Sequence, residues 1–348
     1  MPTKLNRAGQ QQQYVPAGNG DASGEYGNDK GGNKHFKSFN KPTESDNSFS
    51  NVNKQRLGNS LSTQAKSIEQ PKPILKSPSN YDEWAESIMT QERVGNPPEE
   101  IETRVDKTPI AIINDKDIEN AKREFKPETV DRAVNLLRKY EKSVDETARD
   151  LEGIADGMGG LMIGMGFRLK RLGSTSRKLE SYVIEEHANG NTNFTLDDAV
   201  GKMRDVARFT MMFDEKNFES DVQKAMDQLQ KQGYKMVRAK NTFTEGATYK
   251  GLNCNFIDKQ GNVFELQFHV PQSMKIKEGI EADLNTKKVI SNRKNITSHD
   301  IYETTRVIED KMRENKATEE EKMLYDDLTK RNKQRWAEVP NYEFAFLK

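Results

Sequence analysis

Apolar and polar side chains alternate along residues 263–269, VFELQFH. Neighbouring side chains of a strand point to opposite faces, so this pattern predicts a strand with one apolar face and one polar face. Solvated strand faces usually carry Thr, Lys or Ser, whereas this one carries a carboxylate, a carboxamide and an imidazole. The polar face would hold Glu265, Gln267 and His269, and the apolar face would hold Phe264, Leu266 and Phe268.

A second strand is predicted just upstream, within residues 248–256, TYKGLNCNF. The turn DKQGN at residues 258–262 separates the two segments, so we expect them to pair as a hairpin. Pairing would join their polar faces into one surface. Leu252, Cys254 and Phe256 would face the core, where Cys254 acts as an inert small hydrophobe, while Tyr249, Gly251, Asn253 and Asn255 would face the polar side.

From about Asp117 onward, much of the chain shows the apolar spacing of amphipathic helices. The first helical stretch ends at the glycines around 158–160. Its inward face would hold Val130, Ala133, Leu136, Leu137 and Tyr140. Further helices are predicted over Leu196–Met203, over 216–232 and beyond residue 296, and strands over Val206–Phe213 and 234–240.

The order of these elements predicts a mixed β-sheet flanked by helices, which is an α+β fold. We place this domain at residues 116–310 and a C-terminal helical tail at residues 311–348. Residues 1–115 are expected to be disordered or to act as an adaptor, because their early part is rich in Gly, Asn, Gln, Ser, Lys and Pro. One short helix is predicted there, before the Pro-Pro at 97–98.

Composition narrows the range of partners. The 55 basic and 55 acidic residues give a formal net charge of zero, which argues against a generally basic nucleic-acid binder. Cys254 is the only cysteine, so no intramolecular disulfide can form, as is typical of a reducing compartment. The N-terminal segment lacks the apolar region of a secretory signal, and no apolar run approaches a membrane span. We therefore expect a cytoplasmic protein with no membrane partner.

Candidate chemistry gathers on the predicted polar surface. Asp205 lies at the mouth of one strand and Glu265 lies on another. Two carboxylates from different strands can hold Mg²⁺, which keeps several waters and binds substrate phosphates. Tyr249 supplies a ring that can stack on a base. The basic segment FRLKRLGSTSRKLE adds cations and hydroxyls that suit a triphosphate, namely Arg168, Lys170, Arg171, Arg177 and Lys178 around Ser174, Thr175 and Ser176.

At these residues the chain resembles the RelA/SpoT synthetase domain. The segments RLKRLGSTSRK, RDVARF, YKGLN and ELQFH occur in that family's order and approximate spacing, over about residues 130–305. The family has a nucleotidyltransferase-like fold and transfers pyrophosphate from ATP to the 3′-hydroxyl of a guanine nucleotide, making (p)ppGpp. The segments ELQFHVPQS and SHDIYE look most like divergent members in phage and mobile-element proteins.

The resemblance implies a role for each matching residue on the donor side. Asp205 and Glu265 would be magnesium ligands, and Glu265, with Gln267 beside it, could also activate the acceptor hydroxyl. ATP would be the pyrophosphate donor. Its phosphates would be bound by Arg168, Lys170, Ser174 and Lys178.

The acceptor side departs from the family pattern. The family's Tyr-Arg-Ser-x-His corresponds to Tyr249–Asn253, so Asn253 replaces the histidine. His269 stands where the family commonly has arginine, and Arg208 stands at an expected glycine. These departures leave the acceptor open between GDP or GTP and another nucleotide. The residues implied on this side are Tyr249, which would stack on the base, Lys250, Asn253 and His269.

Three functions remain open at this point. The first is a nucleotide pyrophosphokinase, which in this superfamily includes toxins. The second is a phage structural or virion-packaged protein whose degenerate synthetase fold only binds, with residues 1–115 contacting virion or oligomer partners. The third is a toxin that places pyrophosphate on a tRNA 3′ end, with a basic surface formed by Lys235, Arg238, Lys240 and Lys250.

Each candidate also has an ordinary structural interpretation. A strand carboxylate such as Glu265 is usually solvated, and Asp205 could pair with Arg204 or Arg208. His269 fits a hydrogen-bonded structural histidine as well as a base. For His299 and Tyr302, a packing role fits the sequence at least as well as a role in supporting the site. Loop or core roles are expected for Met158, Met162 and Met165.

Overall fold

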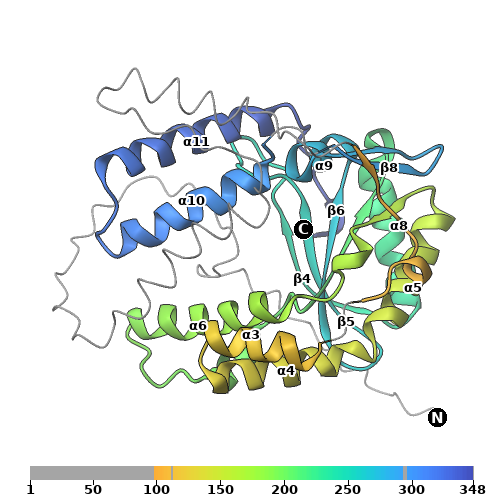
Figure 1. The fold of residues 1–348 in the computed structure, drawn as a ribbon. Helices are drawn as coiled ribbons and strands as arrows, with labels where there is room; N and C mark the ends of the chain where they lie inside the picture. The colour runs from red at the N-terminus through yellow and green to blue at the C-terminus, as the bar shows by residue number, and fades with distance from the viewer. Residues whose placement is uncertain (1–97, 111–112, 293–295, 348) are drawn as a thin grey trace, which may run out of the picture. The chain divides into compact units, whose positions relative to one another are not determined.

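The computed structural model describes residues 98–110, 113–292 and 296–347, and Figure 1 shows how their helices and strands are arranged. Residues 1–97, which are most of the segment expected to be disordered or an adaptor and include the short helix before Pro97, lie outside these described residues. Residues 98–110 of the same segment are described and contain the strand Glu99–Glu100 and the buried Val105. Within them, no helix is both long and apolar enough to cross a membrane.

Helices and strands alternate along the described chain in the order expected of an α+β fold. The helices are α3 (Asp115–Glu124), α4 (Pro127–Glu141), α5 (Val144–Gly157), α6 (Leu172–Ala188), α7 (Leu196–Lys202), α8 (Phe218–Lys231), α9 (Pro271–Glu278), α10 (Ser298–Arg313) and α11 (Glu319–Ala337). The strands are β1 (Glu99–Glu100), β2 (Leu161–Ile163), β3 (Ala207–Met212), β4 (Lys235–Asn241), β5 (Leu252–Ile257), β6 (Val263–His269), β7 (Ile280–Asp283) and β8 (Lys288–Ser291).

Five strands form a mixed sheet in the order β2-β3-β6-β5-β4. β3 and β6 run parallel, while the other neighbours are antiparallel. The expected hairpin is present, because β5 pairs with β6 and places Asn253 opposite Gln267 and Asn255 opposite Glu265. The predicted α+β fold with a mixed sheet is therefore confirmed. A smaller sheet, β1-β8-β7, was not predicted.

Local sequence explains where several helices begin. α7, α10 and α11 each follow a threonine whose hydroxyl accepts the backbone N–H three residues on, while the acidic side chain there bonds back. The stretch expected as one helix up to the glycines is divided into α3, α4 and α5. Phe125 and Lys126 are non-helical before Pro127, because the residue preceding a proline avoids the helical conformation.

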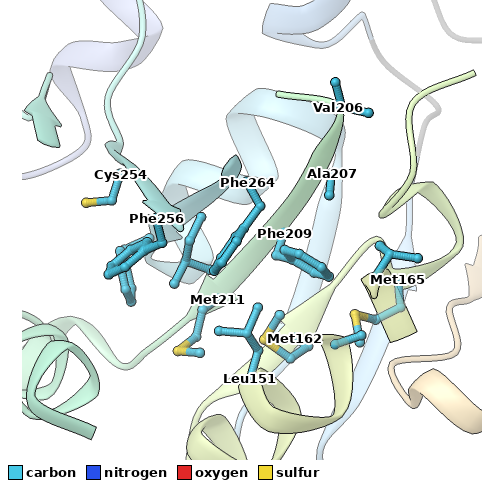
Figure 2. Packing of buried hydrophobic residues seen from close by; sticks show 14 of the residues in the cluster. Leu151, Met162, Met165, Val206, Ala207, Phe209, Met211, Cys254, Phe256 and Phe264 are labelled. Carbon is cyan, nitrogen blue, oxygen red and sulfur yellow. The ribbon is translucent and has the colours of Figure 1, made fainter. Parts of the chain in front are cut away.

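The apolar face of the sheet carries the main core, which α5 and α8 cover. Phe264 stacks on Phe256 across the hairpin and meets Phe209 of β3 edge-on, with ring centroids 5.6 Å apart in both pairs. Figure 2 shows these rings with Leu151 of α5 on the same side. Cys254 is fully buried here, and burial raises the pKa of its thiol, which agrees with an inert core residue.

The C-terminal part consists of the helix pair α10 and α11 and a tail that returns to the sheet. α10 and α11 share their own apolar cluster around Ile308 and Leu328. Trp336 is fully buried and donates its indole N–H to Ser298 Oγ at 2.8 Å. Beyond α11, Phe344 packs on Phe218 of α8 at a centroid distance of 5.9 Å. The tail therefore belongs to the packed part of the domain.

Candidate active site

Asp205 lies just before β3 and is held by two lysines of the basic segment. Lys170 and Lys178 each donate a hydrogen bond to its Oδ2 at 3.0 Å. Its Oδ1 is buried and has no hydrogen-bond partner among the described residues. Burial alone would raise the pKa of Asp205, but the two ammonium groups outweigh it and hold that pKa below its ordinary value. Asp205 is therefore an ionised carboxylate with one oxygen left for a ligand.

Glu265 begins a short hydrogen-bonded chain on the polar face. Gln267 Nε2 donates to Glu265 Oε2 at 2.9 Å, and Lys277 Nζ of α9 donates to Gln267 Oε1 at 2.8 Å. Burial raises the pKa of Glu265, and the negative charge of Asp205 raises it further. The two predicted carboxylates are thus close enough to interact, and Glu265 takes up a proton more readily than an ordinary glutamate.

Lys277 is a component of this group that the sequence did not reveal. Burial lowers the pKa of its ammonium group, and the nearby Arg208 lowers it further. Its Nζ also lies 5.8 Å from the centroid of the Tyr249 ring. Pro271 begins α9 directly after β6, which lets this helix fold back beside the strand and bring Lys277 to Gln267. The proline was visible in the sequence, but the return of the helix was not.

Tyr249, Asn253 and His269 meet in one hydrogen-bonded group. The Tyr249 hydroxyl lies 2.9 Å from Asn253 Oδ1 and 3.0 Å from His269 Nε2. His269 Nδ1 lies 2.9 Å from Ser273 Oγ. Burial lowers the pKa of His269 well below its ordinary value, so the imidazole is neutral. A Cβ at Gly251 would stand 2.4 Å from the Tyr249 hydroxyl, so only glycine leaves room for this arrangement.

The ring of Tyr249 is also packed against protein. It meets Trp336 of α11 edge-on with centroids 5.5 Å apart and His269 with centroids 5.7 Å apart. The residues that depart from the family pattern, Asn253 and His269, are therefore the same ones that fix the tyrosine hydroxyl. Stacking of Tyr249 on an acceptor base stays a prediction.

Two of the predicted binding residues are engaged elsewhere. Arg168 is buried, and its Nε donates to Asp145 Oδ1 at 2.8 Å while its Nη1 donates to the carbonyl of Met165 at 2.6 Å. Lys250 is also buried, and its Nζ donates to Asn341 Oδ1 of the C-terminal tail at 2.8 Å. In this arrangement both side chains support the fold, and neither contacts Asp205 or Glu265.

Ser174 lies in the first turn of α6, four residues before Lys178. Residues four apart lie on the same face of a helix, so its hydroxyl is on the side that reaches Asp205. The structure thus brings Lys170 and Lys178 together with Asp205, close to the Glu265–Gln267 pair. Ser174 lies on the face of α6 that carries Lys178. Lys277 links this group to Tyr249, because it bonds to Gln267 and lies near the tyrosine ring.

The donor set suits a hard cation in part. Among the described residues, no three His, Cys, Asp or Glu side chains gather as a metal site would require on its own. Mg²⁺, however, often takes only one or two carboxylates and completes its shell with waters and substrate phosphates. The partnerless Oδ1 of Asp205 and the neighbouring Glu265 fit that pattern.

The similarity of this chain to known proteins is found among solved structures. No protein-family model matches it, and no curated protein matches it. Among solved structures, it is similar to the Type VI effector Tas1 in complex with its immunity protein, with 15% identity, a TM-score of 0.30, and coverage of 60% of this chain and 95% of that one.

It is also similar to small alarmone synthetase 1 from Bacillus subtilis bound to its product pppGpp. The identity is 14%, the TM-score is 0.29, and the match covers 59% of this chain and 94% of that one.

Proposed function

We propose that this chain is an ATP-dependent pyrophosphokinase that transfers pyrophosphate to a hydroxyl group of a nucleotide. The supporting observation is Asp205, whose Oδ2 is held by Lys170 and Lys178 while its Oδ1 is buried and partnerless beside Glu265. Cations and carboxylates in one group suit the binding of a polyphosphate and the neutralisation of charge during its transfer. The motif resemblance supplies the reaction type.

On the donor side, Lys170, Lys178 and Ser174 would bind the phosphates of ATP. Asp205 Oδ1 and Glu265 would hold Mg²⁺, which when bound would neutralise phosphate charge and align the reacting groups. The two lysines keep Asp205 ionised, because their charges lower its pKa. The carboxylate is therefore available to a cation at any pH at which the protein is folded and the lysines are charged.

On the acceptor side, Glu265 would take the proton of the attacking hydroxyl. In the absence of the cation, burial and the charge of Asp205 raise the pKa of Glu265, and a carboxylate with a raised pKa is a better base near neutral pH than an ordinary one. The hydroxyl oxygen would bond to the β-phosphorus, the bond from that phosphorus to the α,β-bridging oxygen would break, and AMP would leave. Gln267 and Lys277 would orient the Glu265 carboxylate during this step.

Incubation of the protein with ATP labelled at the γ-phosphorus, Mg²⁺ and a panel of acceptors tests this proposal. The panel holds adenine nucleotides, guanine nucleotides and tRNA. We expect label in one acceptor class and one AMP released per label transferred. Release of labelled orthophosphate alone, or no transfer to any acceptor, would contradict the proposal.

A matched pair of variants separates the active group from its surroundings. Glu265→Gln should slow labelling by about 10²- to 10⁴-fold. Lys275→Gln should preserve it, because Lys275 lies on α9 near Lys277 but is exposed and pairs with Glu281 at 3.3 Å. Equal activity in the two variants would remove Glu265 from the reaction.

A further inference from the structure

His269 is the last residue of β6, and both nitrogens of its ring have a polar partner. Nε2 lies 3.0 Å from the Tyr249 hydroxyl, and Nδ1 lies 2.9 Å from Ser273 Oγ. His269 and Ser273 are fully buried. Because no water replaces these partners, the contacts with Tyr249 and Ser273 determine the orientation of the imidazole.

Ser273 is itself fixed by the start of α9. Its Oγ accepts the backbone N–H of Val270 at 3.1 Å, which closes the first turn of the helix that follows β6. Lys277 lies four residues further along the same face of α9 and donates to Gln267 at 2.8 Å. This helix therefore contacts the polar face of β6 at two points, His269 and Gln267.

The hydroxyl of Tyr249 points inward to these buried groups, although a tyrosine usually keeps this polar tip near water. A Cβ at Gly251 would stand 2.4 Å from the hydroxyl, and the ring of Trp336 meets the tyrosine ring edge-on. Tyr249 as a whole is only half-buried, whereas His269 and Ser273 behind it are buried. The tyrosine is thus held at its inner end while part of it stays accessible to a ligand.

We propose that His269 and Ser273 are positioning residues, which orient the Tyr249 ring to stack on the base of the acceptor nucleotide. A ring that is held in place before binding loses little conformational entropy when a base stacks on it, so the base binds more tightly than it would to a mobile ring. The inference rests on the proposed function for the identity of the acceptor, but nucleotide binding can be measured without transfer.

Titration calorimetry with GDP and with ADP, in the absence of ATP, provides the first test. We expect the wild type to bind one of the two, and His269→Leu and Tyr249→Phe each to weaken that binding about 5- to 100-fold, the range for losing a stacked base. His269→Gln, which places an amide nitrogen near the position of Nε2, should restore most of the affinity. The matched control is His187→Gln, because His187 is exposed and its Nε2 lies 2.9 Å from the carbonyl of Phe194.

Inorganic tripolyphosphate distinguishes positioning from a general loss of structure. It should bind to His269→Leu as tightly as to the wild type, because the lysines proposed to hold it, Lys170 and Lys178, contact Asp205. In the transfer reaction, the KM for the acceptor should rise while kcat and the KM for ATP stay unchanged. Equal loss of tripolyphosphate and nucleotide binding would show that His269 only supports the fold, and would overturn the inference.

A double-mutant cycle tests whether the two residues act through the tyrosine hydroxyl. Ser273→Ala should weaken nucleotide binding in the wild type but should have no further effect in Tyr249→Phe, which already lacks the hydroxyl. Additive losses of affinity in the double variant would contradict the proposed role of Ser273. This cycle does not depend on His269→Leu being able to fold.

The remaining outcomes separate the two proposals. Nucleotide binding that His269→Leu and Tyr249→Phe both weaken, without pyrophosphate transfer by the wild type, would support the positioning role and contradict the proposed function. Transfer by the wild type with an unchanged acceptor KM in both variants would do the reverse. Absence of both GDP and ADP binding by the wild type would overturn the inference.

Discussion

Consecutive residues of β6 face two different environments. Leu266 is fully buried in the main core, which α5 and α8 cover. Its burial is favoured by the hydrophobic effect, which is non-directional and needs no particular partner. Glu265, on the opposite face, depends on particular partners, namely the Gln267 amide and the nearby charges of Lys277 and Asp205. The apolar face stabilises the fold, whereas the polar face places one carboxylate near another at a cost in stability. Such an arrangement is more typical of a functional site than of a structural one.

Replacing Glu265 by Gln should separate the two faces most clearly. The amide keeps the shape of the side chain but cannot take a proton, so the transfer rate should fall about 10²- to 10⁴-fold. Burial and Asp205 raise the pKa of Glu265, so its ionised form destabilises the fold above the ordinary value of 4.5. The stability of the variant relative to the wild type should therefore increase as pH rises above that value.

Single-turnover transfer and calorimetric unfolding across this pH range measure the two effects. Glu281→Gln, a change at a half-buried position of β7 that removes the ion pair with Lys275, is the control. If Glu265→Gln lowered activity and stability together, the polar face would be as structural as the apolar one.

The neighbouring change, Leu266→Ala, should have the opposite result. Removal of a fully buried leucine leaves a cavity and should lower the free energy of unfolding by about 2–5 kcal/mol. Transfer per folded molecule should stay within a few-fold of the wild type, because Leu266 points away from Glu265. Urea unfolding gives the first quantity. Leu266→Met, which conserves volume, should cost less than about 1.5 kcal/mol.

Asp205→Asn should change the free energy of unfolding less than Leu266→Ala does, and its effect should depend on pH. The two lysines hold the pKa of Asp205 below its ordinary value of 3.8, so this carboxylate stabilises the fold above that pH and ceases to do so as pH falls below it. At neutral pH the free energy of unfolding of the wild type should exceed that of the variant by about 1–3 kcal/mol, as is typical for hydrogen bonds to a charged group. Urea unfolding at a series of pH values should show this difference in stability shrinking in acid. A constant difference would contradict the stabilisation of the Asp205 carboxylate by Lys170 and Lys178.

Much of the fold was predictable because its main signals are local. The alternation in β5 and β6 and the apolar spacing of α8 predicted their buried faces, and Phe218, Val222 and Leu229 are indeed buried. β2, with three residues, and β7 and β8, with four each, are too short for alternation to show. Pro127 is a sequence signal for a helix break. The apolar spacing continues across it, however, and this favoured the prediction of a single helix.

The candidate site was predictable only where the residues in contact both belong to the recognised sequence motifs. The sequence pointed to Lys170, Lys178 and Asp205 as one group, and they meet in the structure. It could not show that Arg168 is bound by Asp145, because that ion pair depends on how α5 packs beside the basic segment.

The buried thiol of Cys254 provides a built-in probe of this sheet. It is the only cysteine of the chain and lies opposite Leu266 in the hairpin. In the folded state its burial keeps a maleimide away from the sulfur, and the raised pKa keeps the thiol protonated and unreactive. Its rate of alkylation therefore reports how often β5 opens. Slower labelling in the presence of a nucleotide would reveal ligand binding from the opposite face of the sheet, with no label introduced and no residue of the polar face altered.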